Sequence, residues 1–153
     1  MKLNTGFDIS ASALTANRLR MDVISSNIAN AETTRAKIEN GQYVPYKRKM
    51  VVLDANQQSF STLLDKSLNV NEKTTALKGV RVTKIVEDTT PTKLVYNPNH
   101  PDANAEGYVE MPNVDTTVEM IDMIAAQRAY EANITALNAS KSIFQKSLTI
   151  GKG

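Results

Sequence analysis

The first place where this sequence could carry out chemistry is the segment around its only histidine. His100 is followed by the carboxylates Asp102 and Glu106, and an imidazole with two carboxylates is a set that can bind zinc and activate water. A metal hydrolase centred on His100 is therefore one hypothesis. The same segment holds two prolines and two asparagines, which fix an extended path rich in turns. A catalytic zinc site needs three protein ligands held in place. We do not expect this loop to provide them, and the sequence predicts neither metal nor cofactor.

Two further carboxylates, Glu119 and Asp122, lie close enough in sequence to be considered as a general acid–base pair. They also have a structural explanation. Thr116 begins a match to the S/T-x-x-E capping box, in which the glutamate reaches back to the N–H of the cap residue. Carboxylates in a first turn also complement the helix dipole. The chain has no cysteine, so thiolate chemistry and disulfides are excluded. The capping and dipole explanation needs no active site for Glu119 and Asp122, and we prefer it.

A short basic run beside two tyrosines is the third candidate. Lys47, Arg48 and Lys49 follow Tyr43 and Tyr46, and basic residues interleaved with aromatics can contact nucleic acid or an acidic partner surface. The whole chain has 18 basic and 16 acidic residues, a net charge of only +2, whereas nucleic-acid-binding proteins usually carry a basic face. We expect a solvated loop that leads into a strand, and no nucleic acid among the partners.

Length and composition are those of one ordinary domain, or of a small domain with extended arms. The 153 residues are 41% hydrophobic but only 5% aromatic, which favours burial of small residues along helices over a compact aromatic core. The sequence has no uninterrupted apolar run of about 18 residues, so no membrane span is predicted. The N-terminus lacks the apolar segment of a cleavable secretory signal.

The N-terminal segment has the periodicity of a helix that packs along another helix. Its apolar residues recur at intervals of seven, and Ile24 fills one of the positions between them. A single core helix of a globular domain is the other interpretation of so short a repeat. The seven-residue series is Phe7, Leu14, Met21 and Ile28.

The stretch 25–35 is rich in amides and hydroxyls and indicates the end of this helix. Asn, Ser and Thr side chains compete with the helix backbone for hydrogen bonds, and Asn tolerates the left-handed conformation of a C-cap. We expect the helix to end between Ala29 and Ala31.

The middle of the chain predicts short strands joined by turns. Asn40-Gly41 and residues 88–91 are turn signals. Residues 56–76 are polar and weakly patterned, and no conformation is predicted for them. The apolar or β-branched runs that predict strands lie at 50–53, 79–87, 92–96 and 108–111.

The C-terminal segment predicts one long helix. Residues 118–150 contain no Gly and no Pro, and a helix of that span is about 50 Å long, which exceeds the diameter of a compact domain of this size. Two adjoining apolar stripes indicate that several neighbours contact it. One stripe is Met123, Tyr130, Leu137 and Phe144, with Asn133 between, and the second includes Leu148.

Together these elements predict an α+β chain, in which long N- and C-terminal helices form a coiled-coil layer and the middle is a small β-rich domain. The expected parts are 1–35 for the N-terminal helix and its Asn-rich turn motif, 36–115 for the β-rich domain and 116–153 for the C-terminal helix. Isolated helices gain most of their stability from packing. Several apolar faces favour heterologous contacts, which close into rings or continue as helical polymers. The sequence therefore predicts a structural subunit of an assembly.

Three segments resemble the axial proteins of the bacterial flagellum, the family of rod and hook subunits. They are residues 7–14, 26–35 (Ser-Asn-Ile-Ala-Asn-Ala-Glu-Thr-Thr-Arg) and 126–133 (Ala-Gln-Arg-Ala-Tyr-Glu-Ala-Asn). Two more segments, 46–49 and 96–103 (Tyr-Asn-Pro-Asn-His-Pro-Asp-Ala), resemble the branch of that family that builds the proximal rod.

This resemblance implies a building block of the basal-body rod, the drive shaft for motility within the cell envelope. It implies self-association and contact with other rod proteins and the rod–export-gate adaptor. It also implies type III export without a cleaved signal peptide, and neither enzyme activity nor cofactor. The candidate assembly residues are Phe7, Leu14, Met21, Ile24, Asn27, Ile28, Asn30, Thr33, Met123, Tyr130, Asn133, Leu137, Phe144 and Leu148.

Two other readings stay open at this point. The Asn-rich motif is shared across the family, so another axial rod protein is one alternative. A coiled-coil adaptor that binds partners without polymerising is the second, because apolar stripes on helices also serve small closed oligomers.

Overall fold

The computed structural model describes residues 5–39, 41–55 and 79–151 of the 153-residue chain. The segment 56–76, for which the sequence predicts no conformation, lies outside the described residues. The chain divides into two units. The first comprises Met1–Arg18, Val52–Lys84 and Arg128–Gly153, and the second comprises Leu19–Val51 and Ile85–Gln127.

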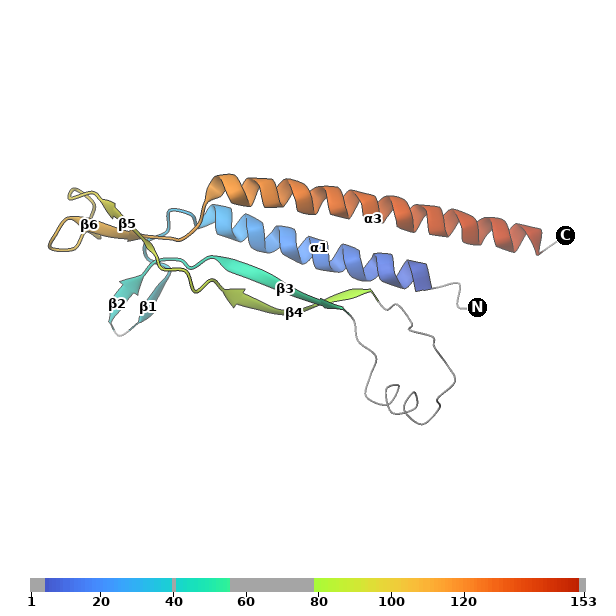
Figure 1. Ribbon diagram of the computed structural model, residues 1–153, viewed down its shortest axis with the longest axis horizontal. Helices are drawn as coiled ribbons and strands as arrows, with labels where there is room; N and C mark the ends of the chain where they lie inside the picture. The colour runs from blue at the N-terminus through green and yellow to red at the C-terminus, as the bar shows by residue number, and fades with distance from the viewer. Residues whose placement is uncertain (1–4, 40, 56–78, 152–153) are drawn as a thin grey trace, which may run out of the picture. The chain divides into compact units, whose positions relative to one another are not determined.

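Two long helices are the largest elements (Figure 1). Helix α1 spans Thr5–Ala29 and helix α3 spans Thr116–Ile150, which gives them 25 and 35 residues. Both helices predicted from the seven-residue periodicity are therefore confirmed, including the end of the second at Ile150.

The end of α1 is made by its own amides. The backbone N–H of Asn30 donates to the Ser26 carbonyl at 3.1 Å, and the Asn30 side-chain amide donates to the same carbonyl at 2.8 Å. Ala31 N–H then reaches back to the Ile28 carbonyl at 3.2 Å. These bonds satisfy carbonyls that a helix end leaves without partners. The predicted end between Ala29 and Ala31 is confirmed.

The start of α3 differs from the prediction. Asp115 Oδ1 accepts the backbone N–H of Thr117 at 2.9 Å and of Val118 at 3.3 Å, so Asp115 is the N-cap. The capping box predicted from Thr116 to Glu119 is therefore wrong. The Glu119 side chain binds an arginine and an asparagine instead, because a charge-assisted hydrogen bond to a guanidinium is stronger than one to a neutral N–H.

The described strands pair into three two-stranded sheets, β1 with β2, β3 with β4 and β5 with β6. All four predicted strands are confirmed and correspond to β3 through β6. The strands are β1 (Lys37–Glu39), β2 (Gln42–Val44), β3 (Lys49–Ala55), β4 (Val80–Glu87), β5 (Lys93–Tyr96) and β6 (Tyr108–Met111).

The β1–β2 hairpin was not predicted. The solvated loop expected between residue 35 and β3 instead contains an antiparallel pair in which Lys37 faces Val44 and Glu39 faces Gln42. Gly41 lies in the turn with φ of 81°, a conformation that favours glycine. Five of the six strand residues are exposed. The hairpin therefore lacks the alternation of buried and exposed residues from which a strand is predicted.

The β5–β6 hairpin is antiparallel and places its tyrosines side by side. Tyr96 faces Tyr108 across the pair, with ring centroids 5.3 Å apart in an edge-to-face arrangement. Val109, on the opposite face of β6, is only 2% exposed and belongs to the core of the second unit. One face of β6 is therefore buried at Val109, and the other face of the hairpin carries the two tyrosine rings.

In the first unit, Ser12 of α1 holds the beginning of β4. Its hydroxyl donates to the Ile9 carbonyl at 2.7 Å and accepts the Val80 N–H at 3.2 Å. The neighbouring Gly79 has φ of 76°, and a Cβ there would collide with the Ser12 hydroxyl. This close approach requires glycine.

In the second unit, α1 and α3 pack antiparallel to each other. Arg20 Nη2 lies 4.0 Å from Asp122 Oδ1, and Asn27 Nδ2 lies 3.0 Å from Glu119 Oε2, so later residues of α1 meet earlier residues of α3. The core of this unit consists of small and medium side chains and one aromatic ring, that of Tyr46. Its members are Val23, Ile24, Tyr46, Val109, Val114 and Ala126.

The predicted α+β class, with long terminal helices and a small middle region of short antiparallel strands, is confirmed. In the residues that the structure describes, no helix is long and apolar enough to span a membrane. The three-part division at residues 35 and 115 stays a prediction.

Two glycines allow a test of the β5–β6 hairpin. Gly107 has φ of 82°, and a Cβ there would lie 3.0 Å from the Tyr96 ring, whereas Gly41 has φ of 81° with nothing within 4 Å of that position. We expect Gly41→Ala to cost about 1–2 kcal/mol through backbone strain alone. Gly107→Ala should cost more, because the ring must also move. Urea denaturation of both variants measures the difference, and an equal loss would contradict the close contact.

Candidate assembly site

A fully bonded asparagine of α1 is the centre of the polar cluster in the second unit. Asn27 is 1% exposed. Its Nδ2 donates to the Lys49 carbonyl at 2.9 Å and to Glu119 Oε2 at 3.0 Å, and its Oδ1 accepts from Tyr46 Oη at 3.0 Å and from Lys49 N–H at 2.9 Å. All four hydrogen bonds available to the amide are therefore made inside the chain.

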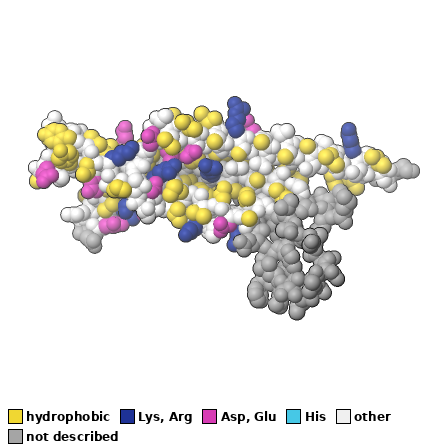
Figure 2. All heavy atoms as spheres, viewed as in Figure 1, with side chains coloured by type: hydrophobic (Ala, Val, Ile, Leu, Met, Phe, Trp, Pro, Cys, Tyr) yellow, Lys and Arg dark blue, Asp and Glu magenta, His cyan; other side chains and the backbone are white. Residues whose placement is uncertain are grey.

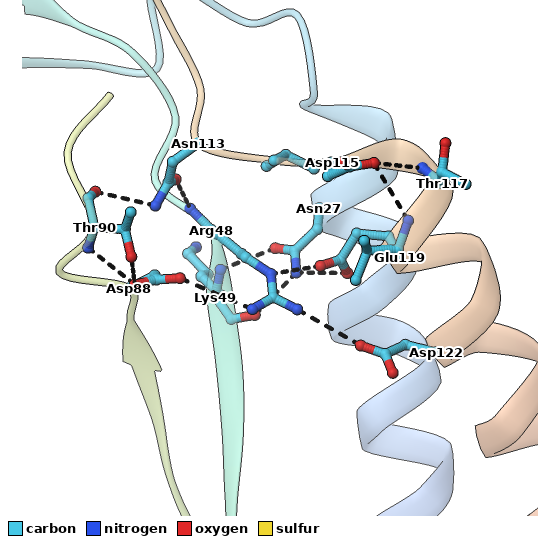
Figure 3. Close-up of polar contacts among 12 residues, drawn as sticks. Asn27, Arg48, Lys49, Asp88, Thr90, Asn113, Asp115, Thr117, Glu119 and Asp122 are labelled. Atoms are coloured by element: carbon cyan, nitrogen blue, oxygen red, sulfur yellow. Dashed lines mark hydrogen bonds and ion pairs between the residues drawn. The ribbon is translucent and has the colours of Figure 1, made fainter. Parts of the chain in front are cut away.

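The second member is a buried ion pair (Figure 3). Glu119 of α3 is 1% exposed, and its Oε1 accepts from Arg48 Nε at 2.5 Å. The Arg48 guanidinium also lies 3.6 Å from Asp122 and 3.8 Å from Asp88. Figure 3 shows the guanidinium lying among these three carboxylates. We call Asn27, Arg48 and Glu119 the Glu119 clasp.

Hydrogen bonding to Glu119 is the main reason that the pKa of Arg48 is raised above its ordinary value. Burial acts in the opposite direction, and the charges of Glu119, Asp88 and Asp122 add to the increase. The site thus favours the charged form of Arg48. That charge compensates the cost of burying the Glu119 carboxylate.

A loop after β4 and the segment before α3 hold Arg48 in position. The backbone N–H of Arg48 donates to Asn113 Oδ1 at 2.9 Å, and its carbonyl accepts the Asp88 N–H at 2.7 Å. Asp88 itself accepts from the hydroxyl and N–H of Thr90, which lower its pKa, with the hydroxyl the larger cause. The clasp is therefore supported by backbone from two further segments.

A second polar contact joins the two most distinctive sequence motifs. Asp102, in the His-Pro-Asp segment, accepts from Thr34 Oγ1 at 2.8 Å and binds the Arg35 guanidinium, and both partners belong to the Asn-rich motif after α1. The Arg35 guanidinium also lies over the Tyr43 ring, 5.0 Å from its centroid. We call Thr34, Arg35 and Asp102 the Asp102 tie.

The histidine segment also has a structural role. His100 Nδ1 accepts the Asp102 N–H at 3.1 Å. This bond shapes the loop in which the Asp102 carboxylate faces Thr34 and Arg35. Within the described part of the chain, no three His, Asp or Glu side chains are grouped as metal ligands.

The predicted assembly residues occupy different environments. Ile24 and Asn27 are buried, whereas Phe7, Phe144 and Leu148 are 42%, 47% and 56% exposed. Asn30 and Thr33 are joined by a 3.3 Å hydrogen bond. The remaining members are partly buried, and they are Leu14, Met21, Ile28, Met123, Tyr130, Asn133 and Leu137. The structure therefore brings only the Asn-rich motif together with the clasp, and an assembly role for the whole set stays a prediction.

Sequence reasoning missed the two charged members of the clasp. The sequence presents Arg48 only as part of a basic run that could meet an acidic surface, whereas the structure places it among three carboxylates of its own chain. The local capping pattern assigns Glu119 to a helix cap. A signal existed, because Glu119 precedes the buried Ala126 by seven residues and so lies on the same face of α3.

Comparison with known proteins finds flagellar rod proteins. A family model described as "Flagella basal body rod protein" matches residues 7–37, and one described as "Flagellar basal body rod FlgEFG protein C-terminal" matches residues 105–150. The flagellar basal-body rod protein FlgC of Bacillus subtilis (strain 168) is 54% identical over 145 residues, which cover 95% of each chain. The chain belongs to the FlgC family of flagellar basal-body rod proteins.

More distant FlgC proteins cover the chain equally well. The FlgC of Yersinia enterocolitica is 41% identical over 152 residues, 99% of this chain and 100% of its own. That of Borreliella burgdorferi is 40% identical over 164 residues, 100% of both chains. Asn27 and Glu119 lie in the two segments that the rod family models match, whereas Arg48 lies between those segments.

Loss of Arg48 should destabilise the second unit strongly. Arg48→Met leaves the Glu119 carboxylate buried without its cation, which costs about 3–5 kcal/mol in such pairs. Adding Glu119→Gln should recover at least half of that loss, because Gln removes the charge and still accepts from Asn27. Urea denaturation measures both variants. The matched control is Arg128→Met, since the exposed Arg128–Glu131 pair contributes about 0–1 kcal/mol; equal effects of Arg48→Met and Arg128→Met would contradict the clasp.

The Asp102 tie makes a prediction about pH. The hydrogen bond from Arg35 is the main cause, and that from Thr34 the second, of the lowered pKa of Asp102. A carboxylate with a lowered folded-state pKa contributes stability above its unfolded pKa and loses it as the pH falls through the folded value. Arg35→Gln should therefore return the Asp102 pKa toward its ordinary value, as measured by NMR titration of the carboxyl carbon. Lys37→Gln is the control, and an unchanged Asp102 titration in Arg35→Gln would reject the tie.

Proposed function

We propose that this chain is a structural subunit of the bacterial flagellar basal-body rod and that it assembles through its two terminal helices. Membership of the FlgC family supports the rod. The observation that supports assembly through the helices is the large amount of apolar surface left exposed on α3 within a single chain. Only Glu119 and Ala126 are buried among the residues of that helix.

The exposed apolar side chains of α3 are too many for a helix that functions alone. Figure 2 shows hydrophobic side chains on the visible surface of this helix. Helices gain most of their stability by packing an apolar face, and burial yields roughly 25 cal/mol per Å² of apolar surface. Neighbouring subunits would provide that burial. The exposed members are Val118, Met120, Ile121, Ile124, Ile134, Ile143, Phe144, Leu148 and Ile150.

The candidate assembly residues divide between two roles in this proposal. Exposed members, such as Phe7, Phe144 and Leu148, contact neighbouring subunits directly. Buried members, such as Ile24 and Asn27, act by holding α1 and the following turn in the arrangement that the neighbours recognise. This division follows the exposed fractions of the side chains, and it assigns to Asn27 a role in orientation.

The finer position within the flagellum rests on the resemblance of residues 46–49 and 96–103 to the proximal-rod branch. On that basis the subunit lies in the proximal rod within the cell envelope, contacts other rod proteins, copies of itself and the rod–export-gate adaptor, and leaves the cytosol through the type III export apparatus without cleavage of a signal peptide. Its role is mechanical, with no catalysis.

The experiment that tests assembly replaces apolar residues that one chain leaves exposed. Phe144→Ser with Leu148→Ser should change the free energy of unfolding of the isolated chain little, since exposed substitutions usually stay within about 0.5 kcal/mol. In cells that lack the normal copy, the double variant should abolish swimming and leave few rods in electron micrographs. Lys146→Ser, which lies between the two positions, is the control and should leave motility unchanged.

Two outcomes would contradict this function. Normal rods and motility in the double variant would exclude α3 as the packing surface. Stable small oligomers with saturating stoichiometry in the purified protein, together with normal motility in a deletion strain, would favour the non-polymerising adaptor instead.

A further inference from the structure

The second unit contains a groove that the clasp and the terminal helices do not use. Its volume is about 490 Å³. One side is the β1–β2 hairpin and the other is the β5–β6 hairpin, with the Asp102 loop between them. The residues that line it are Thr34, Glu39, Gln42, Tyr43, Val44, Pro45, Asp102, Asn104, Tyr108 and Glu110.

Strand β2 presents an open edge to this groove. Four consecutive residues, Gln42 to Pro45, line it. Successive side chains of a strand point to opposite faces, so a groove lined by consecutive residues follows the edge of the strand. Within the described sheet β2 pairs only with β1, so the N–H and C=O groups along its other edge are free to receive an extended chain.

Strand β6 presents a face to the same groove. Tyr108 and Glu110 are two residues apart and therefore point to the same side of the hairpin. Their cross-strand partners, Tyr96 and Leu94, are 65% and 64% exposed. This exposed surface extends the wall of the groove with aromatic and aliphatic area that a side chain of an added strand could cover.

The charge of the groove selects what can enter. Its described lining includes the carboxylates of Glu39, Asp102 and Glu110 and no basic residue. Lys37 of the same chain binds Glu39, with 2.7 Å between Nζ and Oε1, and Arg35 binds Asp102. Glu110 is the lining carboxylate for which the described residues show no ion pair, and a carboxylate beside a tyrosine ring, here that of Tyr108, favours a guanidinium or an ammonium group.

We propose that this groove binds an extended segment of a neighbouring protein chain, which adds to the open edge of β2 and places an arginine or lysine beside Glu110 and Tyr108. The main-chain bonds to β2 supply affinity that does not depend on sequence, and the acidic and aromatic walls select a basic side chain. This interaction surface lies outside the terminal helices, and its test in cells rests on the proposed rod function.

The test uses the full chain and two blocked peptides, acetyl-Thr-Val-Arg-Val-Thr-amide and its counterpart with Glu in place of Arg. In two-dimensional NMR, the Arg peptide should shift the backbone signals of residues 42–45 and 108–110 and leave those of α3 unchanged. The Glu peptide should bind more weakly. Equal shifts with both peptides, or shifts that lie elsewhere, would overturn the proposal.

A charge variant identifies the carboxylate responsible. Glu110→Gln should weaken binding of the Arg peptide about two- to fivefold, as expected for one exposed ion pair. Glu106→Gln removes the same charge from outside the groove lining and should leave the affinity unchanged. Equal weakening in the control would point to a general charge effect and reject the specific groove.

A measurement in cells tests the same groove in the assembled protein. A photo-cross-linking residue at position 42 should join this chain to a neighbour in assembled flagella, and mass spectrometry should locate the join within a segment that contains Lys or Arg. Position 106 is the control. Motile cells with no product at position 42 would reject the groove and leave the rod function intact.

Discussion

The buried carboxylate of Glu119 is the constraint on which the second unit depends. A carboxylate that is 1% exposed loses nearly all of its hydration, and an uncompensated loss of that kind costs several kcal/mol. The compensation comes from Arg48 and Asn27, whose side chains reach both Glu119 oxygens. Because neither partner lies in the same helix as Glu119, the carboxylate can be buried only when α1, α3 and the segment before β3 meet in one arrangement.

This requirement connects parts of the chain that are far apart in sequence. Asn27 and Glu119 are separated by 92 positions, and Arg48 and Glu119 by 71. Closing loops of that length costs conformational entropy. Non-polar contacts between the helices could offset this cost in several registers, because such contacts are not directional. A single hydrogen-bonded arrangement removes that freedom, since a shift of one helical residue would leave a charge and an amide buried without partners. The clasp therefore fixes the register between the helices, and the apolar core adds stability to the register so chosen.

Sequence periodicity was sufficient to predict both helices and the four strands from β3 to β6, because each has a run of apolar or β-branched residues. It failed where structure depends on contacts between distant segments. The β1–β2 hairpin is almost entirely exposed, so its sequence shows only the turn at Gly41. Glu119 satisfied a local capping pattern, and the pattern does not show that Asp115 takes the cap while Arg48 attracts the glutamate. For Asp102 the sequence offers a metal ligand only as an unfavoured hypothesis, and it does not show that Arg35 and Thr34 bind this carboxylate.

The polar contacts and the exposed apolar surface have different roles in an assembling subunit. Hydrogen-bonded charges are satisfied inside the chain, and each described buried side-chain nitrogen or oxygen has a partner, so they define shape without a neighbour. The apolar residues of α3 remain exposed and gain free energy only when another chain covers them. On the proposed export route this separation is favourable, because in the unfolded chain Glu119 is hydrated at no cost. The carboxylate can be buried only with Arg48 beside it, so the second unit satisfies its buried charges without a neighbouring chain.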